Sequence, residues 1–301
     1  MKQITLEELL EAGCHFGHQV TRSNPKARDF VFEARDNIQI IDLAKTKDGL
    51  DEAADFVKHL GQNGGNLLVV GTKRQAKEIV EQEINRINDL LKESKKEHIG
   101  NIYYITQRWI GGILTNFAEV SKNFKKLKDL KETVSNPEAA GKYTKKEIGL
   151  FEKEIQKLES YYKGVSEMKD KPQALFIIDS HLEDLAVREA RNMGVETVAI
   201  VDTNADPYLI DHPIPANDDA VGSIRLILAH ILDAWEEGVK AQKQPSAKAP
   251  DGKQPKAEKQ EKPKAEQAEN VSKNKNKKTE NPKTKTSKET KQSHKKEKSG
   301  K

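Results

Sequence analysis

Short apolar runs alternate with amphipathic segments along much of this 301-residue chain, and this alternation most constrains its fold. Several runs have the length and composition of buried strands: NLLVVG (66–71), IYYIT (102–106), QALFIID (173–179), TVAIVD (197–202) and a shorter one near Ile214. Others have helical periodicity: 72–93, 182–194 and 218–238. Strands that alternate with helices indicate a parallel sheet covered on both faces, with right-handed crossovers. We therefore predict an α/β protein with a parallel sheet flanked by helices.

The N-terminal part predicts two helices and two short strands. Thr5 and Glu8 have the T-x-x-E spacing of a capping box, and Gly13 is placed to end the short helix that follows. After CHFGHQ comes a polar loop with three cations, TRSNPKARDF (21–30). The segments DFVFEA and NIQIID then resemble strands, and residues 43–62 a helix.

Two amphipathic segments in the middle of the chain predict an antiparallel helical hairpin, a coiled coil, over residues 117–168. Their apolar residues recur at steps of three or four: Phe117, Val120, Phe124, Leu127, Leu130 and Val134, then Ile148, Phe151, Ile155, Leu158, Tyr162 and Val165. Thr144 and Glu147 again have capping-box spacing. We expect the second helix to run from about Lys145 to Met168 and to project beyond the sheet domain.

Positive charge is concentrated at the C-terminal end. Residues 243–301 carry 19 lysines, no arginine and 8 acidic residues, a net charge of +11, so the whole-chain charge of +4 leaves −7 on residues 1–242. Such a segment has too few apolar residues to offset the entropy of ordering, which predicts a disordered Lys-rich tail at 242–301. The tail either binds phosphate weakly or only keeps the protein soluble. The predicted organisation is a discontinuous α/β domain (1–116 and 169–241), the hairpin (117–168) and the tail.

Composition also excludes several classes of protein. Cys14 is the single cysteine, so no intramolecular disulfide is possible. The N-terminus has no apolar signal core, and no run of about 18 apolar residues predicts a membrane span. We expect a soluble, cytoplasmic protein. Because residues 1–242 are net acidic, nucleic-acid binding there has to depend on local basic patches.

One strand–turn–helix junction, VVGTKRQ (69–75), has the position of a phosphate-binding loop but lacks its sequence. The dinucleotide fingerprint needs three glycines, and the P-loop ends in G-K-[ST]. For a small ligand, a tight turn is therefore the better interpretation. Lys73 and Arg74 still make this helix start cationic, which favours contact with a phosphate backbone.

Two groups of polar residues invite chemical interpretations. His15 and His18 have a spacing that could ligate a metal on a helix, but no third ligand is evident nearby, so a structural or RNA-facing role is favoured. The tripeptide DSH (179–181) is adjacent in sequence, whereas a catalytic triad converges in space, so helix capping explains it better.

Polar residues also follow the strand run TVAIVD. Asp202, Asn204 and Asp206 lie at the expected carboxyl end of this strand, where ligands bind in doubly wound folds. Asx turns before Pro207 explain these residues about as well. A nucleotide-binding enzyme that uses the Asp202 region is therefore the alternative function.

The stretch QRWIGGILTNF (107–117) places a cation, an aromatic ring and two glycines between a strand and a helix. Arg108 can clamp a phosphate with two donors, and Trp109 can stack on a base. Gly111 and Gly112 allow a tight turn and a close approach of RNA to the backbone. A core position is the other interpretation of Trp109.

Together these segments resemble the bacterial small ribosomal subunit protein two family, from about Leu6 to Gly238. The motifs occur in order: LLEAGCHFGHQ, NPKARDFVFEARDNIQIIDLAKT, VVGTKRQA, QRWIGGILTNF, YTKKE, ALFIID, VAIVDTNADP and IPANDDAVGSI. The resemblance implies a Rossmann-like fold with an inserted coiled-coil hairpin. It also implies a non-catalytic protein of the cytoplasmic ribosome that binds small-subunit ribosomal RNA and helps seat neighbouring proteins, notably the mRNA-binding protein one. A scaffold whose hairpin binds only protein is not distinguished from this role.

The chain departs from the family pattern at three places. Ser23 stands where an aromatic usually precedes N-P-K, which puts one stacking contact in doubt; Ala216 replaces a usual glycine; and residues 85–101 are longer than usual. We expect no cofactor, metal, membrane or small-molecule substrate. The candidate RNA-binding residues are Arg22, Asn24, Lys26, Arg28, Lys73, Arg74, Gln107, Arg108, Trp109, Lys122, Lys125 and Lys126.

Overall fold

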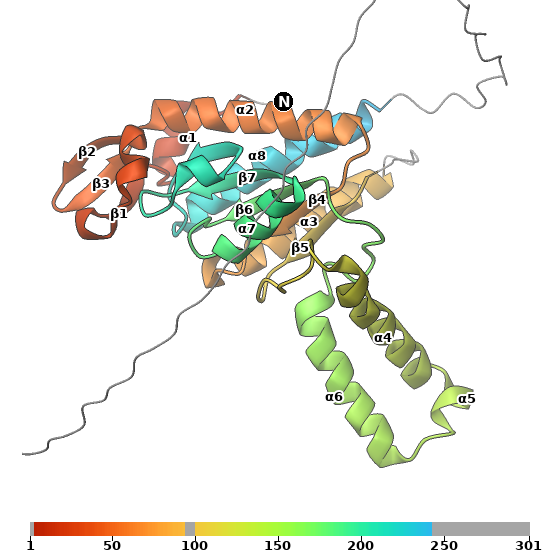
Figure 1. Ribbon diagram of the computed structural model, residues 1–301. Helices are drawn as coiled ribbons and strands as arrows, with labels where there is room; N and C mark the ends of the chain where they lie inside the picture. Colours follow the sequence, from red (N-terminus) through yellow and green to blue (C-terminus); the bar gives the residue numbers. More distant parts are fainter. Residues whose placement is uncertain (1–2, 94–99, 243–301) are drawn as a thin grey trace, which may run out of the picture. The chain divides into compact units, whose positions relative to one another are not determined.

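The centre of the protein is a five-stranded parallel sheet with the order β5-β4-β6-β7-β8 (Figure 1). This is a computed structural model, and it describes residues 3–93 and 100–242. The strands are β4 (Leu67–Val70), β5 (Ile102–Ile105), β6 (Ala174–Ile178), β7 (Glu196–Val201) and β8 (His212–Pro215). The α/β prediction is therefore confirmed. The predicted tail and residues 94–99 of the longer segment lie outside the described residues.

Both faces of this sheet are covered, because successive side chains of a strand point to opposite faces. On one face Leu67, Val69 and Phe176 pack with α2 (Leu43–Gln62), α3 (Arg74–Glu93) and α8 (Val221–Lys240). On the other face Leu68, Val70 and Ile177 pack with α7 (Asp184–Met193), with the segment around Trp109 and with the start of α4 (Phe117–Ser135). The central strands are therefore buried on both sides, which explains their unbroken apolar runs.

A small antiparallel sheet, β1-β3-β2, precedes the parallel one. It consists of β1 (Phe16–Gln19), β2 (Val31–Arg35) and β3 (Ile38–Ile41) and follows the short helix α1 (Leu6–Glu11). Positive φ angles of 49° at Asp36 and 65° at Asn37 form the tight turn between β2 and β3. The sequence did not predict β1, and the polar loop after it contains two 3₁₀ turns, η1 (Val20–Arg22) and η2 (Pro25–Phe30). A third 3₁₀ turn, η3 (Pro207–Leu209), follows β7.

Two long helices, α4 and α6 (Lys145–Tyr162), form the hairpin, joined through the short helix α5 (Pro137–Ala140) (Figure 1). The capping box of Thr144 and Glu147 is present, as is that of Thr5 and Glu8. The first helix buries Val120, Phe124 and Leu127, whereas no residue of α6 is buried. Lys126–Glu154 and Lys131–Glu159 ion pairs cross between the two helices. Packing of the hairpin is therefore concentrated at its base.

The second hairpin helix is shorter than expected. It ends at Tyr162, not at Met168, because the chain turns against strand β5: Tyr104 donates its backbone N–H to the Gly164 carbonyl at 3.1 Å. Val165 and Met168 are buried in the core beyond this turn. Their apolar spacing continued the helical pattern although the backbone is no longer helical there.

No helix among the described residues combines the length and hydrophobicity needed to cross a bilayer.

Candidate functional site

Four aspartates gather where strands of the parallel sheet end, and we call them the acidic centre: Asp179, Asp202, Asp218 and Asp219. Asp179 follows β6, Asp202 follows β7, and the other two follow β8. Asp179, Asp202 and Asp218 are buried, with 4%, 2% and 0% exposure. Buried carboxylates need compensating charge or hydrogen bonds, and the surrounding residues supply part of both.

Lys73 is the internal counter-ion of the acidic centre. Its Nζ lies 2.9 Å from Asp179 Oδ2 and 2.7 Å from Oδ1 of both Asp218 and Asp219. Burial opposes its charge, but the neighbouring carboxylates outweigh this and raise the pKa of Lys73. Burial, together with repulsion by Asp179 and Asp202, raises the pKa of Asp218. Lys73 is therefore already paired inside the protein, which counts against the expectation that it contacts a phosphate backbone.

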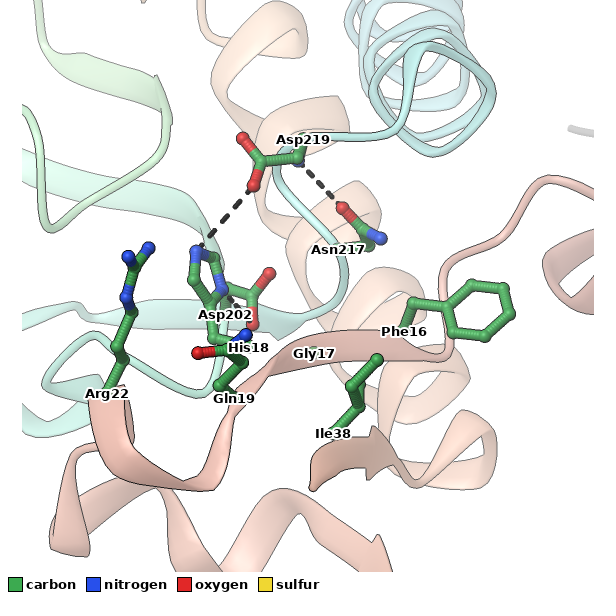
Figure 2. Close-up of a pocket in the computed structure, with 9 residues that line it drawn as sticks. All are labelled: Phe16, Gly17, His18, Gln19, Arg22, Ile38, Asp202, Asn217 and Asp219. Carbon is green, nitrogen blue, oxygen red and sulfur yellow. Dashed lines mark hydrogen bonds and ion pairs between the residues drawn. The ribbon is translucent and has the colours of Figure 1, made fainter. Parts of the chain in front are cut away.

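His18 reaches the acidic centre from β1 (Figure 2). Its Nδ1 lies 3.1 Å from Asp202 Oδ1 and its Nε2 lies 3.6 Å from Asp219 Oδ2. The hydrogen bond with Asp202 raises the pKa of His18, against the effect of burial. Its backbone N–H donates to Thr203 Oγ1 at 2.9 Å. A Cβ on the preceding Gly17 would stand 2.7 Å from Thr203 Cγ2, so glycine at this position lets β1 come close to the segment that follows β7.

A pocket of about 220 Å³ opens beside His18, lined among others by Arg22, Asp202, Asn217 and Asp219 (Figure 2). His15 does not line the pocket; its ring lies against Phe16, tilted by 40° with the centroids 3.9 Å apart. The two histidines therefore do not act together. The residues that contact the His18 side chain instead come almost 200 positions later in the chain. They follow strands of the parallel sheet, whose carboxyl ends lie at one edge of that sheet.

The acidic centre is a poor site for a nucleotide. Four carboxylates face one ammonium there, so a phosphate would be repelled. Asp202 Oδ1 accepts from the backbone N–H of Thr203 at 2.5 Å, and Asp206 caps the turn η3. Asp179 Oδ1 accepts from Leu182 N–H at 2.8 Å, in agreement with a capping role for the DSH tripeptide. The geometry thus disfavours the Asp202 region as a phosphate-binding enzyme site.

On the opposite face of the sheet, Glu189 of α7 organises the 107–117 stretch. Its Oε1 accepts from Gly112 N–H at 2.7 Å and from Trp109 Nε1 at 3.3 Å, and its Oε2 accepts from Leu114 N–H at 3.3 Å. The backbone N–H and hydroxyl of Thr115 also donate to Oε2, at 3.3 and 3.1 Å. Burial opposes the charge, but these hydrogen bonds together lower the pKa of Glu189. The carboxylate thus fixes a turn in which Gly112 has a φ of 94°.

Trp109 is a core residue. It is 5% exposed and packs in the same apolar cluster as Leu114 and Val187. The expectation that its ring stacks on a base is therefore corrected, because its faces are covered by protein. The neighbouring Arg108 is exposed instead, and it has no ion pair within the described parts of the chain. Gln107, also exposed, accepts from Lys77 Nζ of α3 at 3.0 Å.

Some of the remaining candidate RNA-binding residues already have an ion pair or hydrogen bond within the protein, and others do not. Lys26 pairs with Asp206 at 2.5 Å, Lys122 with Glu119 at 2.7 Å and Lys126 with Glu154. Asn24 caps η2 through Lys26 N–H at 3.0 Å. Five of the candidates are exposed cations for which no ion pair occurs in residues 3–93 and 100–242: Arg22, Arg28, Arg74, Arg108 and Lys125.

Comparisons with known proteins extend over most of the chain. Residues 9–238 match the family model described as ribosomal protein S2. The chain is also 43% identical over 249 residues to the small ribosomal subunit protein uS2 of Corynebacterium urealyticum, an alignment that covers 83% of this chain and 88% of that protein.

Proposed function

The chain belongs to the ribosomal protein S2 family, and from this premise we propose that it is a non-catalytic, structural constituent of the small ribosomal subunit. In this role it binds small-subunit ribosomal RNA and helps dock neighbouring proteins, including the mRNA-binding protein one. Its place of action is the ribosome.

The observation that carries the RNA-binding proposal is the presentation of Arg108. Trp109 beside it is buried, and Glu189 holds the following turn through five donor groups. Because the backbone at Arg108 is already fixed, the loop needs no ordering when the guanidinium binds. It can then give two parallel hydrogen bonds to a phosphate without first breaking an ion pair.

Other exposed cations enlarge this surface. Arg74 begins α3, one turn before Lys77, whose Nζ contacts the loop at Gln107. Arg22 lies in the turn η1 and Arg28 in the turn η2. Between these turns, the backbone N–H of Asn24 donates to the Thr203 carbonyl at 2.8 Å, which holds the segment against the residues after β7. Cations therefore flank the acidic centre, whose negative charge Lys73 compensates only in part. These exposed cations support contact with a polyanion around the acidic centre, at the carboxyl edge of the parallel sheet.

Replacing Arg108 with alanine should weaken incorporation into small subunits about ten- to a hundredfold. The loss of one charge-assisted hydrogen-bonded contact, roughly 1.5–3 kcal/mol, gives this range. Arg108→Lys should recover only part, because an ammonium lacks the planar pair of donors. The measurement is competition of each variant against wild type during subunit reconstitution, quantified by mass spectrometry.

Arg188→Ala is the matched control for Arg108→Ala, because Arg188 is also exposed but pairs with Asp184 at 2.6 Å. It should compete as well as wild type, and urea unfolding of all three variants should be nearly unchanged. If Arg108→Ala assembles like Arg188→Ala, the loop is only a connection into the hairpin and the phosphate contact is wrong.

We assign the docking of neighbouring proteins to the outer part of the hairpin. Leu150 and Tyr143 are 57% and 44% exposed there, among many charged side chains. The apolar residues Val120, Phe124 and Val165 at its base belong instead to the core. The outer part of the hairpin thus offers a surface for contact with other proteins, whereas its base is part of the core.

Replacing residues 129–152 with a short Gly/Ser linker should leave the unfolding free energy nearly unchanged, because the buried base is retained. The amount of protein one in subunits assembled with this variant should fall. Quantitative mass spectrometry of purified subunits measures this, with wild-type protein as the reference. If the subunit composition is unchanged, the outer part of the hairpin does not dock protein one.

A further inference from the structure

Tyr208 presents an aromatic ring to solvent in the segment that follows β7. It lies in the turn η3 and is 68% exposed. Pro207 begins this turn with a fixed φ, and the Tyr208 backbone N–H donates to Asp206 Oδ1 at 3.2 Å. The Tyr208 hydroxyl reaches Asp29 Oδ2 at 3.5 Å. Because both the backbone and the outer end of the side chain have a partner, the ring loses little freedom when a flat group stacks on it.

Positive charge lies beside this ring. The turn η3 packs against η2, which carries Lys26, Arg28 and Asp29. Lys26 is paired with Asp206 at 2.5 Å, whereas Arg28 is exposed and has no ion pair among the described residues. Proteins hold single-stranded nucleic acid by combining an aromatic ring, on which a base stacks, with cations along the phosphate backbone. Paired bases inside a duplex do not offer a free face to such a ring.

A pocket of about 280 Å³ adjoins Tyr208, since Asp206 and Leu209 on either side of it line this pocket. Its wall also includes the buried Val187 and Ser180. Ser180 is 8% exposed, and its hydroxyl has no hydrogen-bond partner among the described residues. A buried polar group without a partner is costly, so this hydroxyl is evidence for a ligand with a polar edge. The volume is at the low end of ligand pockets, roughly 300 Å³ and upward, and suits a single ring system.

The charges in the wall of this pocket favour an uncharged ligand. Asp206 is paired with Lys26, and Asp184 with Arg188 at 2.6 Å. Asp184 and Arg188 are therefore occupied by each other, and neither is assigned a contact with the ligand. Apolar walls with a few polar groups fit a flat ring that has polar edges, which describes a nucleobase.

We propose that this surface binds an unpaired stretch of RNA. One base stacks on Tyr208, a neighbouring base enters the pocket at Ser180, and Arg28 contacts the phosphate backbone. Consecutive Cα atoms are about 3.8 Å apart, so Tyr208 and the pocket wall at Leu209 are close enough for neighbouring bases. The inference rests on the proposed function and names the form of RNA that this part of the surface takes.

The test measures binding of short RNAs to the full-length chain by fluorescence anisotropy over a series of salt concentrations. The probes are a labelled hexaadenylate, an abasic chain of the same length and an RNA duplex. Any phosphate contact, including one made by the Lys-rich residues 243–301, weakens as salt rises, and it is shared by the hexaadenylate and the abasic chain. Wild type should prefer the hexaadenylate by at least about fivefold, and this preference should persist at high salt.

Variants locate the bases. Tyr208→Ala should remove most of the preference, whereas Tyr208→Phe keeps the ring and should retain it. Ser180→Ala should reduce the preference about two- to tenfold, without lowering the melting temperature, because the hydroxyl has no partner in the free protein. Tyr161→Ala is the matched control, since Tyr161 is also exposed but lies in α6, and it should bind like wild type. Binding of the duplex should be the same for all four variants.

Three results would overturn the inference: no preference for bases in wild type, an undiminished preference in Tyr208→Ala, or an equal loss of duplex binding in Tyr208→Ala. Displacement of the hexaadenylate by adenosine monophosphate at the same base concentration would make a free nucleotide the ligand and would overturn RNA as its source. Failure of the proposed ribosomal role appears separately, because wild type would then not enter reconstituted small subunits, whatever its preference for bases.

Discussion

Replacing Lys73 with methionine is expected to destabilise the isolated protein by about 3–5 kcal/mol, because removal of one partner leaves buried charges without compensation. The Lys73 side chain is only 13% exposed, and its ammonium touches three carboxylates of the acidic centre within 2.9 Å. Methionine keeps the length and the apolar stem, so lost packing contributes little. Urea unfolding of the isolated protein measures the effect.

The control for this change is Lys77→Met, one turn later in α3. Lys77 makes a hydrogen bond to Gln107 Oε1 but no ion pair within the described residues, so its loss should change stability by about 0.5 kcal/mol or less. Should Lys73→Met unfold like wild type and yet assemble poorly, Lys73 would be a phosphate contact after all. The internal counter-ion role would then be wrong.

Most of the fold could be predicted because its signals are local. The buried strands β4 and β6 are continuous apolar runs, and the helix predicted at 43–62 coincides with α2. Strand β1 could not be found in this way. It has four residues, includes Gly17 and His18, and is stabilised by pairing with β3 and by the Thr203 hydroxyl far along the chain.

The candidate site was less predictable, because its key contacts join distant residues. The strand-end position of Asp202 was foreseen from the strand pattern, but its pairing with His18 depends on β1. Glu189 lies in an ordinary amphipathic helix, and nothing near it in sequence shows that its carboxylate holds a turn 74–80 residues earlier. That missing information is also why the sequence left Trp109 open between RNA stacking and a core position. The ring and the exposed Arg108 are adjacent in sequence, but one is buried and the other faces solvent.

Replacing Trp109 with alanine is expected to destabilise the protein by about 3–5 kcal/mol, since a large, almost fully buried ring is removed and its cavity cannot collapse completely. The loss should appear in urea unfolding of the isolated protein, without RNA. Trp109→Phe is the informative control. It keeps an aromatic ring in the cluster but removes the Nε1–H that donates to Glu189 at 3.3 Å, one of five donors on that carboxylate. It should therefore cost clearly less than alanine.

The same pair of variants separates the two interpretations of the tryptophan in assembly. If the ring is structural, Trp109→Phe should enter small subunits nearly as well as wild type. Trp109→Ala should compete poorly in proportion to its lost stability, because Arg108 is then presented from a loosened loop. If Trp109→Ala keeps wild-type stability but assembles poorly, the ring stacks on RNA. Its buried position in the free protein would then have to change on binding.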